Sequence, residues 1–408
     1  MRRDVSQRTL APALSSEKSV IVLPFANLSA NPEDEYFSDG LTEELITDLS
    51  RVVDLRVVPS AAAFRLKNTA KDLVTIGREY NVRYVLEGRV RKAGQRARIT
   101  AQLVDVWGDR PIWADKYPGE LDRVFELQKR VSRAIAEALQ MHIRPPSRAP
   151  KAEASEAYLK GLHFARQATA EGLHKALQYF QQAAEIDPAY VRALAAMAET
   201  YVTLTMAWET LPAHETMPKA RTAAQRALDL DPNSAEAHTA LALVSMYYDW
   251  DLARAEQAFK EALRLNPHSV EAHVWYGTLL IWLDTRYDEA LLHLQHATQL
   301  DHVDPWLQVW GGWVYVFSRD HNRAIDHARQ VIALHPLYGY AHYYLGCALL
   351  MTGQTTEGIA SFRRAIELAW TNCASRTSVR SYSRGLKTRR KPRPWKSFTL
   401  AVANSVTP

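Results

Sequence analysis

The sequence predicts two fold classes in one chain, an α/β amino-terminal domain and then an all-α superhelix of helix-turn-helix units. Two patterns support this prediction. Apolar residues alternate with polar ones between 82 and 106, which is typical of strands. Further on, a phrase with a small residue first, an aliphatic residue three places later and usually a proline two places beyond that recurs at residues 183–188, 227–232, 262–267, 297–302, 331–336 and 365–370.

Length and composition are those of an ordinary globular protein. The chain has 408 residues, 47% apolar and 23% charged, which suits two or three domains and excludes disordered and fibrous classes. Two cysteines, Cys347 and Cys373, form neither a disulfide framework nor a zinc-binding spacing, which indicates a reducing compartment. Residues 1–17 lack the apolar run of a secretory signal, and no apolar stretch reaches the ~18 residues of a membrane span. We therefore expect a cytoplasmic location.

The formal charge of +5 is distributed unevenly. Residues 370–408 hold nine lysines and arginines and no acidic residue, so the rest of the chain carries a formal charge of −4. A mildly acidic body argues against general binding of nucleic acid. The basic tail fits either a contact with nucleic acid or acidic lipid, or a disordered extension. We favour the extension because the tail has no helical period.

The elements of the amino-terminal domain follow from its apolar patterns. Short runs predict, in order, a strand over 19–25, a helix over 39–52, a strand over 55–59 and a helix over 72–80. Asp39 and Thr42 are capping residue types at the start of the first helix. The alternation over 82–106 predicts a hairpin with Gly94 in its turn, and a helix over 120–140 closes the domain.

An acidic cluster precedes the first predicted helix and extends into it. No glycine-punctuated ligand loop of the calcium-binding kind surrounds these residues, and carboxylates are expected near a helix start. We interpret the cluster as capping and solvated residues, namely Glu33, Asp34, Glu35 and Asp39.

Two long phrases carry a family resemblance. SVIVLPFANLSANPEDEYFSDGLTEELITDLSRV and VRYVLEGRVRKAGQRARITAQLVDV resemble the TolB-amino-terminal-like α/β domain, over roughly residues 18–140. Domains of this kind accompany tetratricopeptide repeats in the regulatory half of bacterial class III adenylate and guanylate cyclases, in winged-helix regulators and in kinases. The resemblance implies a sensor or docking module. An output domain of about 100–200 residues would not fit before residue 18, so we expect the cyclase catalytic domain to be absent from this chain.

The recurring phrase resembles the ends of tetratricopeptide helix pairs, because its starts lie 44, 35, 35, 34 and 34 residues apart. The predicted organisation is a polar leader over 1–17, the TolB-like domain over 18–141, a linker over 142–152, about six repeats over 153–369, and the basic tail over 370–408. The long interval contains two prolines between 207 and 220, which forbid a continuous helix and predict an enlarged loop.

In this class of repeat, positions two, five, six, nine and thirteen of each first helix face a concave groove. In the last three units these positions are rich in aromatic residues, which suit an extended peptide or an amphipathic helix. The alternative is that individual rings pack between neighbouring repeats. The candidate partner-binding residues are Arg192, Glu199, Glu236, Glu271, Trp275, Trp282, Trp306, Val309, Trp310, Trp313, Tyr340, Tyr343 and Tyr344.

A receptor for a chain terminus is not expected. That variety of repeat needs cations and amides at groove positions, whereas this chain has Trp275, Trp310 and Tyr344 there. Arg192 is the only groove cation that the pattern assigns. Polar recognition would therefore depend on the three groove glutamates.

The histidines do not predict a metal site. His238, His273 and His342 share the fourth position of three different repeats, and stacked repeats lie about 10 Å apart, too far for ligands at about 2 Å. His293 and His296 lie one helical turn apart, but no further ligand completes a site. We predict packing or solvation for these residues, and no metal.

The motifs of common enzymes are also missing from the sequence. It contains no phosphate-binding glycine loop, no nucleophile elbow and no zinc-peptidase motif, so we predict no catalytic residues and no cofactor. The leading hypothesis is a non-catalytic regulatory or scaffold protein that binds a protein segment through the repeat groove. The alternative is the regulatory fragment of an adenylate or guanylate cyclase, or of a transcription regulator.

Overall fold

The computed structural model describes residues 18–372 apart from 53, 95, 109, 121–123, 142–147, 149, 168, 207–210 and 284–285. The chain divides into two compact units. The first comprises residues 1–279 with 299–301, and the second comprises 280–298 with 302–408. The predicted linker falls mostly outside the described residues, and so do the polar leader and residues 373–408.

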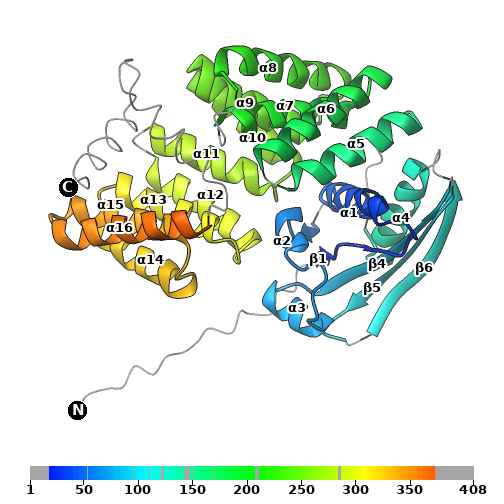
Figure 1. Cartoon of the computed structure of the whole chain (residues 1–408), viewed down its shortest axis with the longest axis horizontal. Coiled ribbons are helices and arrows are strands. Elements are labelled where there is room, and N and C mark those ends of the chain that lie inside the picture. The colour runs from blue at the N-terminus through cyan, green and yellow to red at the C-terminus, as the bar shows by residue number, and fades with distance from the viewer. Residues whose placement is uncertain are drawn as a thin grey trace. The chain divides into compact units, whose positions relative to one another are not determined.

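The first unit begins with a mixed sheet (Figure 1). Its strands are ordered β3 (Arg56–Val57), β1 (Ser19–Val22), β4 (Tyr84–Ala93), β5 (Arg96–Asp105) and β6 (Arg110–Glu120), while β2 (Ala26–Asn27) pairs with β4. β1 runs parallel to β3 and β4, whereas β4, β5 and β6 form an antiparallel meander. The predicted hairpin is confirmed, and Gly94 adopts a φ of +58° in its turn, where glycine bears no steric penalty.

Four helices accompany this sheet: α1 (Glu35–Leu49), preceded by a short 3₁₀ turn (Pro32–Asp34), α2 (Ser60–Phe64), α3 (Leu73–Glu79) and α4 (Val124–Ala138). α1 and α4 pack against each other and against the sheet (Figure 1). The predicted strands and helices are thus present, but α2, β2 and β6 were not predicted. β6 lies at the edge of the sheet, and Tyr117 is its only buried residue. Its sequence therefore shows little alternation of apolar and polar residues.

The prediction that Asp39 and Thr42 cap a helix is wrong. α1 starts at Glu35, so both residues lie inside the helix and are buried. The Thr42 hydroxyl donates to the Ser38 carbonyl and accepts from the Phe25 amide. Capping patterns mislead here because an earlier turn, around Pro32, begins the helical path.

Within the described residues, twelve helices follow two by two: α5 (Ala152–Ala165), α6 (Ala170–Ile186), α7 (Val191–Met206), α8 (Ala213–Leu230), α9 (Ala235–Val244) continued by a π-helical turn (Ser245–Asp249), α10 (Leu252–Leu265), α11 (Val270–Trp282), α12 (Tyr287–Leu300), α13 (Pro305–Phe317), α14 (His321–Leu334), α15 (Gly339–Met351) and α16 (Thr355–Asn372). This helical arrangement confirms the predicted solenoid class for the carboxyl-terminal part.

The enlarged loop predicted between 207 and 220 is largely helical. α8 begins at Ala213 and includes Pro218. A proline in the second turn of a helix removes the hydrogen bond to the carbonyl four residues back, here that of His214, which is exposed and open to water. With 18 residues, against 14 in α10, α12 and α14, α8 accounts for part of the long interval, and residues 207–210 lie outside the described part.

The fourth-position histidines support the turns between repeats. A ring nitrogen of His238 lies 3.0 Å from the Pro232 carbonyl oxygen, and His342 stands in the same relation to Pro336 at 3.0 Å. His273 makes the third such contact, at 2.9 Å from Pro267. These contacts confirm the packing role. No three of the described histidines, cysteines and acidic residues are grouped so that they could hold a metal ion.

The last helix differs from prediction at its end. The repeats were expected to stop at 369, whereas α16 continues to Asn372. None of the helices within the described residues has the length and apolar character needed to cross a membrane.

Candidate functional site

Helix α1 of the α/β domain packs directly against the first repeats inside the first unit. The close approach depends on Gly40, because a Cβ atom there would lie 2.6 Å from Cδ2 of Leu159 on α5. Buried polar side chains line the same contact. The α/β domain and the first repeat helices are thus packed together through α1 and α5.

Arg192 on α7 lies at the centre of this contact. Its guanidinium pairs with Glu44 and Asp48 of α1, and the three side chains are 9%, 2% and 4% exposed. Gln128 of α4 donates to both carboxylates at 3.0 and 3.1 Å, and Ser132 donates to Asp48 at 3.0 Å. Arg192 was predicted to face a partner, but here its charge is balanced within the chain.

These charges shift each other's proton affinity. Burial raises the pKa of Glu44, and the positive charge of Arg192 offsets only part of that effect. Burial also acts to raise the pKa of Asp48, but attraction to Arg192 outweighs it and the pKa is lowered. Arg192 itself stays protonated, because the two carboxylates outweigh burial and raise its pKa. The charges of Arg192, Glu44 and Asp48 are therefore balanced only in the folded protein, where the three side chains meet.

A second group of charges surrounds Asp39 of α1, with cations from the α/β domain and from the first repeat. The Asp39 carboxylate is paired with Lys67 at 2.6 Å, Arg166 at 2.8 Å and His163 at 3.1 Å. Burial acts to raise its pKa, but the hydrogen bond from His163 and the charge of Arg166 outweigh burial, so the pKa is lowered. Asp39 is therefore a structural anion and not one of the solvated residues that the sequence suggested.

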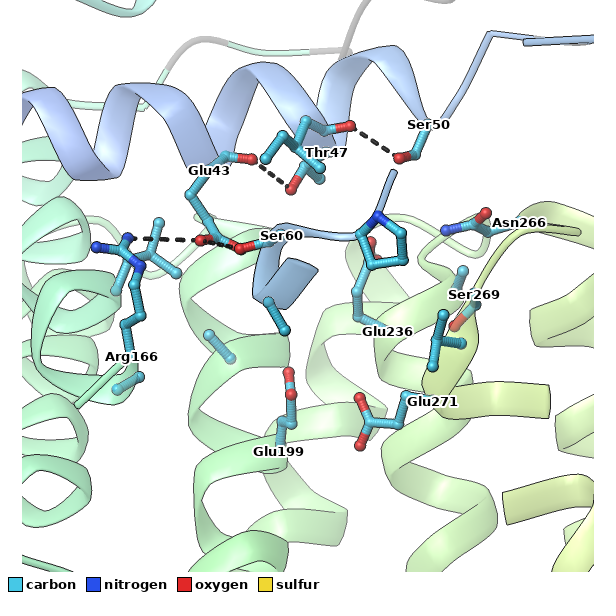
Figure 2. Close-up of a pocket in the computed structure, with 18 of the residues that line it drawn as sticks. Glu43, Thr47, Ser50, Ser60, Arg166, Glu199, Glu236, Asn266, Ser269 and Glu271 are labelled. Atoms are coloured by element: carbon cyan, nitrogen blue, oxygen red, sulfur yellow. Dashed lines mark hydrogen bonds and ion pairs between the residues drawn. The ribbon is translucent and has the colours of Figure 1, made fainter. Parts of the chain in front are cut away.

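Beside these ion pairs lies a cavity of about 1470 Å³ within the first unit. One wall comes from α1 and α2, and the facing wall comes from α5, α7, α9 and the start of α11 (Figure 2). On the α1 side, the Glu43 carboxylate accepts from Ser60 at 2.6 Å and lies 3.5 Å from the Arg166 guanidinium. The opposite wall is acidic.

Three predicted groove residues meet on that wall: Glu199 on α7, Glu236 on α9 and Glu271 on α11 (Figure 2). Repulsion from Glu271 is the main cause that raises the pKa of Glu199 well above its usual range, with burial second and Glu236 third. Burial is the main cause that raises the pKa of Glu271. Glu199 and Glu271 therefore influence each other's pKa across this wall.

Replacing Glu199 by glutamine is expected to stabilise the protein at pH 8 and to have little effect at pH 4. The folded-state pKa of Glu199 is raised, chiefly by Glu271 and also by burial, Glu236 and Glu43. The wild-type carboxyl therefore destabilises the fold increasingly as pH rises from its unfolded pKa through its folded pKa. We expect a rise in melting temperature of about 2–4 °C at pH 8.

Thermal unfolding followed by circular dichroism between pH 4 and pH 8 measures this difference. Glu185→Gln, on the exposed side of α6, is the control and should leave the pH profile unchanged. An equal gain at pH 4 and pH 8 for Glu199→Gln would contradict the raised pKa of Glu199.

The second unit carries an aromatic surface on α13 and α15. Trp306 and Trp310 are half-buried with ring centroids 5.7 Å apart, and Tyr340 and Tyr343 are half-buried and stacked at 5.8 Å. We call these four residues the aromatic surface. Each of the four side chains is only partly buried.

Other predicted groove residues lie deeper. Val309, Trp313 and Tyr344 belong to the hydrophobic core of the second unit, and the Tyr344 hydroxyl donates to the Gly312 carbonyl at 2.7 Å. The packing alternative that the sequence left open applies to these three.

Trp282 on α11 is half-buried, and so is Trp275, whose ring meets that of Tyr247 edge-on.

Sequence reasoning did not find the α1 wall of the cavity. Glu43 and Ser60 come from the α/β domain, and Arg166 from the first repeat. No local pattern links residues more than 100 positions apart, so the sequence held no signal for this juxtaposition.

Comparison with known families separates the two kinds of domain. Residues 16–133 match the model of the HilA/YgeH-like transcriptional regulator, second domain. Residues 249–305 and 311–372 match a tetratricopeptide repeat model. The chain therefore carries a HilA-like regulator domain followed by tetratricopeptide repeats. These matches do not confirm the resemblance to a TolB-like domain, which stays a prediction.

One curated relative is "Putative adenylate cyclase 3" of Rhizobium meliloti (strain 1021). It is 34% identical over 239 residues, which are 57% of this chain and 41% of that protein. The chain thus spans less than half the length of this relative. The matched family models describe a regulator domain and repeats, and neither is a cyclase catalytic domain.

Solved structures with similar helices are repeat proteins. "YrrB: a TPR protein with an unusual peptide-binding site" is 19% identical with a TM-score of 0.34, covering 50% of this chain and 97% of that one. A thermophilic TPR protein of Thermus thermophilus, TTC0263, is 17% identical with a TM-score of 0.39, covering 48% of this chain and 99% of that one.

Proposed function

We propose that the chain is a non-catalytic regulatory or scaffold protein that binds a protein partner through its repeats. The observation that carries this proposal is the aromatic surface, with Trp306 and Trp310 on α13 beside Tyr340 and Tyr343 on α15. Rigid rings bury a large area at low entropic cost, and such residues dominate binding energies. In the proposed arrangement the α/β domain serves as the sensor or docking module, in a bacterial cytoplasm.

Replacing Trp306 and Trp310 by alanine is expected to abolish most partner binding. Hot-spot aromatic residues contribute about 2 kcal/mol or more each, so loss of both should lower the affinity of a captured partner by roughly several hundredfold. Affinity capture from the source cell, followed by titration of the captured protein, measures the effect.

The matched control replaces Leu334 and Leu337 by alanine, because both are strongly exposed apolar residues of the same unit outside the aromatic surface. Equal loss of binding in both double variants would show that non-specific hydrophobic contacts, and not the aromatic surface, bind the partner. Undiminished binding by the tryptophan variant would contradict the proposal.

A second candidate function is favoured by the similarity to the cyclase relative and by the regulator domain match. In this proposal the chain is the regulatory part of an adenylate or guanylate cyclase, or of a transcription regulator. Reading the neighbouring DNA for a cyclase, kinase or winged-helix frame discriminates the two. Nucleotide turnover by the purified chain would overturn the non-catalytic role in both.

A further inference from the structure

The charges on the two walls of the cavity in the first unit are balanced differently. On the α1 wall, Asp39 and Glu43 each face the Arg166 guanidinium. On the repeat wall, no salt bridge among the described residues joins Glu199, Glu236 or Glu271 to a lysine, arginine or histidine. The repeat wall therefore brings three carboxyl groups to the cavity that take no part in the ion pairs of the α1 wall, while Arg51, Arg65 and Lys67 line the cavity from the α/β domain.

The repeat helices gather these carboxyl groups on one side of the cavity (Figure 2). Glu236 and Glu271 lie 35 residues apart at the second position of α9 and α11, and Glu199 points to the same space from α7 (Figure 2). Stacked repeats bring equivalent positions to one concave face.

The size and chemistry of the cavity favour a segment of protein over a small molecule. Its volume of about 1470 Å³ exceeds the ~300–1,000 Å³ of ordinary small-molecule sites. Asn233, Asn266 and Ser269 also line it and supply donors and acceptors for a peptide backbone. Phe64 and Leu230 add apolar surface for side-chain stems.

We propose that this cavity receives a basic segment of a partner protein, with an arginine or lysine side chain among Glu199, Glu236 and Glu271. The segment brings a positive charge to these three carboxyl groups, while its backbone contacts the amides and hydroxyls of the rim. This inference rests on the proposed function, because it names the chemistry of the protein segment that the repeats bind. It places that segment in the first unit and leaves the aromatic surface as a second contact.

The test uses the full chain and three fluorescein-labelled twelve-residue peptides in 150 mM NaCl. Each peptide has leucine and serine at the same eight positions, and the other four positions carry arginine, glutamine or glutamate. Fluorescence anisotropy should show the arginine peptide binding at least about tenfold more tightly than the glutamine peptide. The glutamate peptide should bind most weakly.

A matched pair of triple variants locates the binding. Glu199→Gln with Glu236→Gln and Glu271→Gln should weaken binding of the arginine peptide at least about tenfold. Glu153→Gln with Glu171→Gln and Glu185→Gln removes the same charge from exposed positions of α5 and α6 and should leave binding within about twofold. Circular dichroism confirms that both variants fold, and the single variant Glu236→Gln replaces the first triple if it does not.

If both triple variants bind the arginine peptide equally weakly, the peptide is attracted by the overall negative charge of the protein and not by this site. That result would overturn the proposal. Equal affinity for the three peptides would overturn it as well. If argininamide alone binds as tightly as the arginine peptide, the occupant is a small cation and the proposal fails. If the tryptophan variant loses its partner while no peptide binds, this inference fails and the proposed function stands. If the arginine peptide binds with the expected glutamate dependence while the tryptophan variant keeps its partner, the basic-segment site stands without the aromatic surface.

Discussion

Replacing Arg192 by alanine is expected to lower the free energy of unfolding by about 3–5 kcal/mol, because it leaves buried carboxylates without their counter-charge. Glu44 and Asp48 are 2% and 4% exposed, and they would face each other across the space left by the guanidinium. Gln128 could still donate to both carboxylates, but an amide does not replace a positive charge. The loss should be greatest above pH 5, where both carboxyls tend to ionise in the unfolded chain.

Urea unfolding monitored by circular dichroism measures this loss. Arg226→Ala removes an exposed arginine from α8 and should change the free energy by less than about 0.5 kcal/mol. The triple variant Arg192→Met with Glu44→Gln and Asp48→Asn removes all three charges together and should recover most of the loss. An Arg192→Ala protein as stable as the wild type would contradict the docking of α1 on the repeats.

Two adjacent glycines of α13 are expected to respond in opposite directions to alanine. A Cβ atom at Gly312 would lie 2.5 Å from the Tyr344 hydroxyl oxygen and 2.6 Å from Nδ1 of His327. It would also disturb the hydrogen bond from Tyr344 to the Gly312 carbonyl. Overpacking of this kind costs about 1–3 kcal/mol.

Gly311 offers the matched control. Its nearest neighbour for a Cβ atom is the Thr298 hydroxyl oxygen at 3.8 Å, which is an ordinary contact distance. Gly311→Ala should therefore raise the free energy of unfolding by about 0.5–1 kcal/mol, because alanine favours a helix interior. Melting curves of the two single variants measure the difference. Equal stability of the two variants would show that Tyr344 and His327 move aside without cost.

The repeat signal was readable because it is local. Ala324, Ala328 and Val331 are buried on α14 as the period predicts, and the helix ends before Pro336. The predicted strand over 19–25 was equally clear, since all four residues of β1 are buried. In these segments the burial of each residue follows a short period that the sequence displays directly.

Capping and loop predictions were less secure because tertiary packing overrides them. Asp39 has a capping residue type, yet α5 and Lys67 surround it with positive charge and hold it inside α1. Pro218 indicates a break, yet α8 continues through it. Arg192 has the spacing of a groove residue, and the chain's own helix α1 occupies that position.

By itself, the sequence determined the order of an α/β domain and a helical solenoid, and the repeat period. It also determined that the first helix of each of the last three repeats is rich in aromatic residues. Only the tertiary structure decided which of those aromatic rings are buried and which are partly buried, that Arg192 forms ion pairs with α1, and which carboxylates line one cavity. The reason is physical: periodicity records which face of an element is buried, whereas ion pairs such as that of Arg192 with Glu44 depend on long-range contacts that no local pattern encodes.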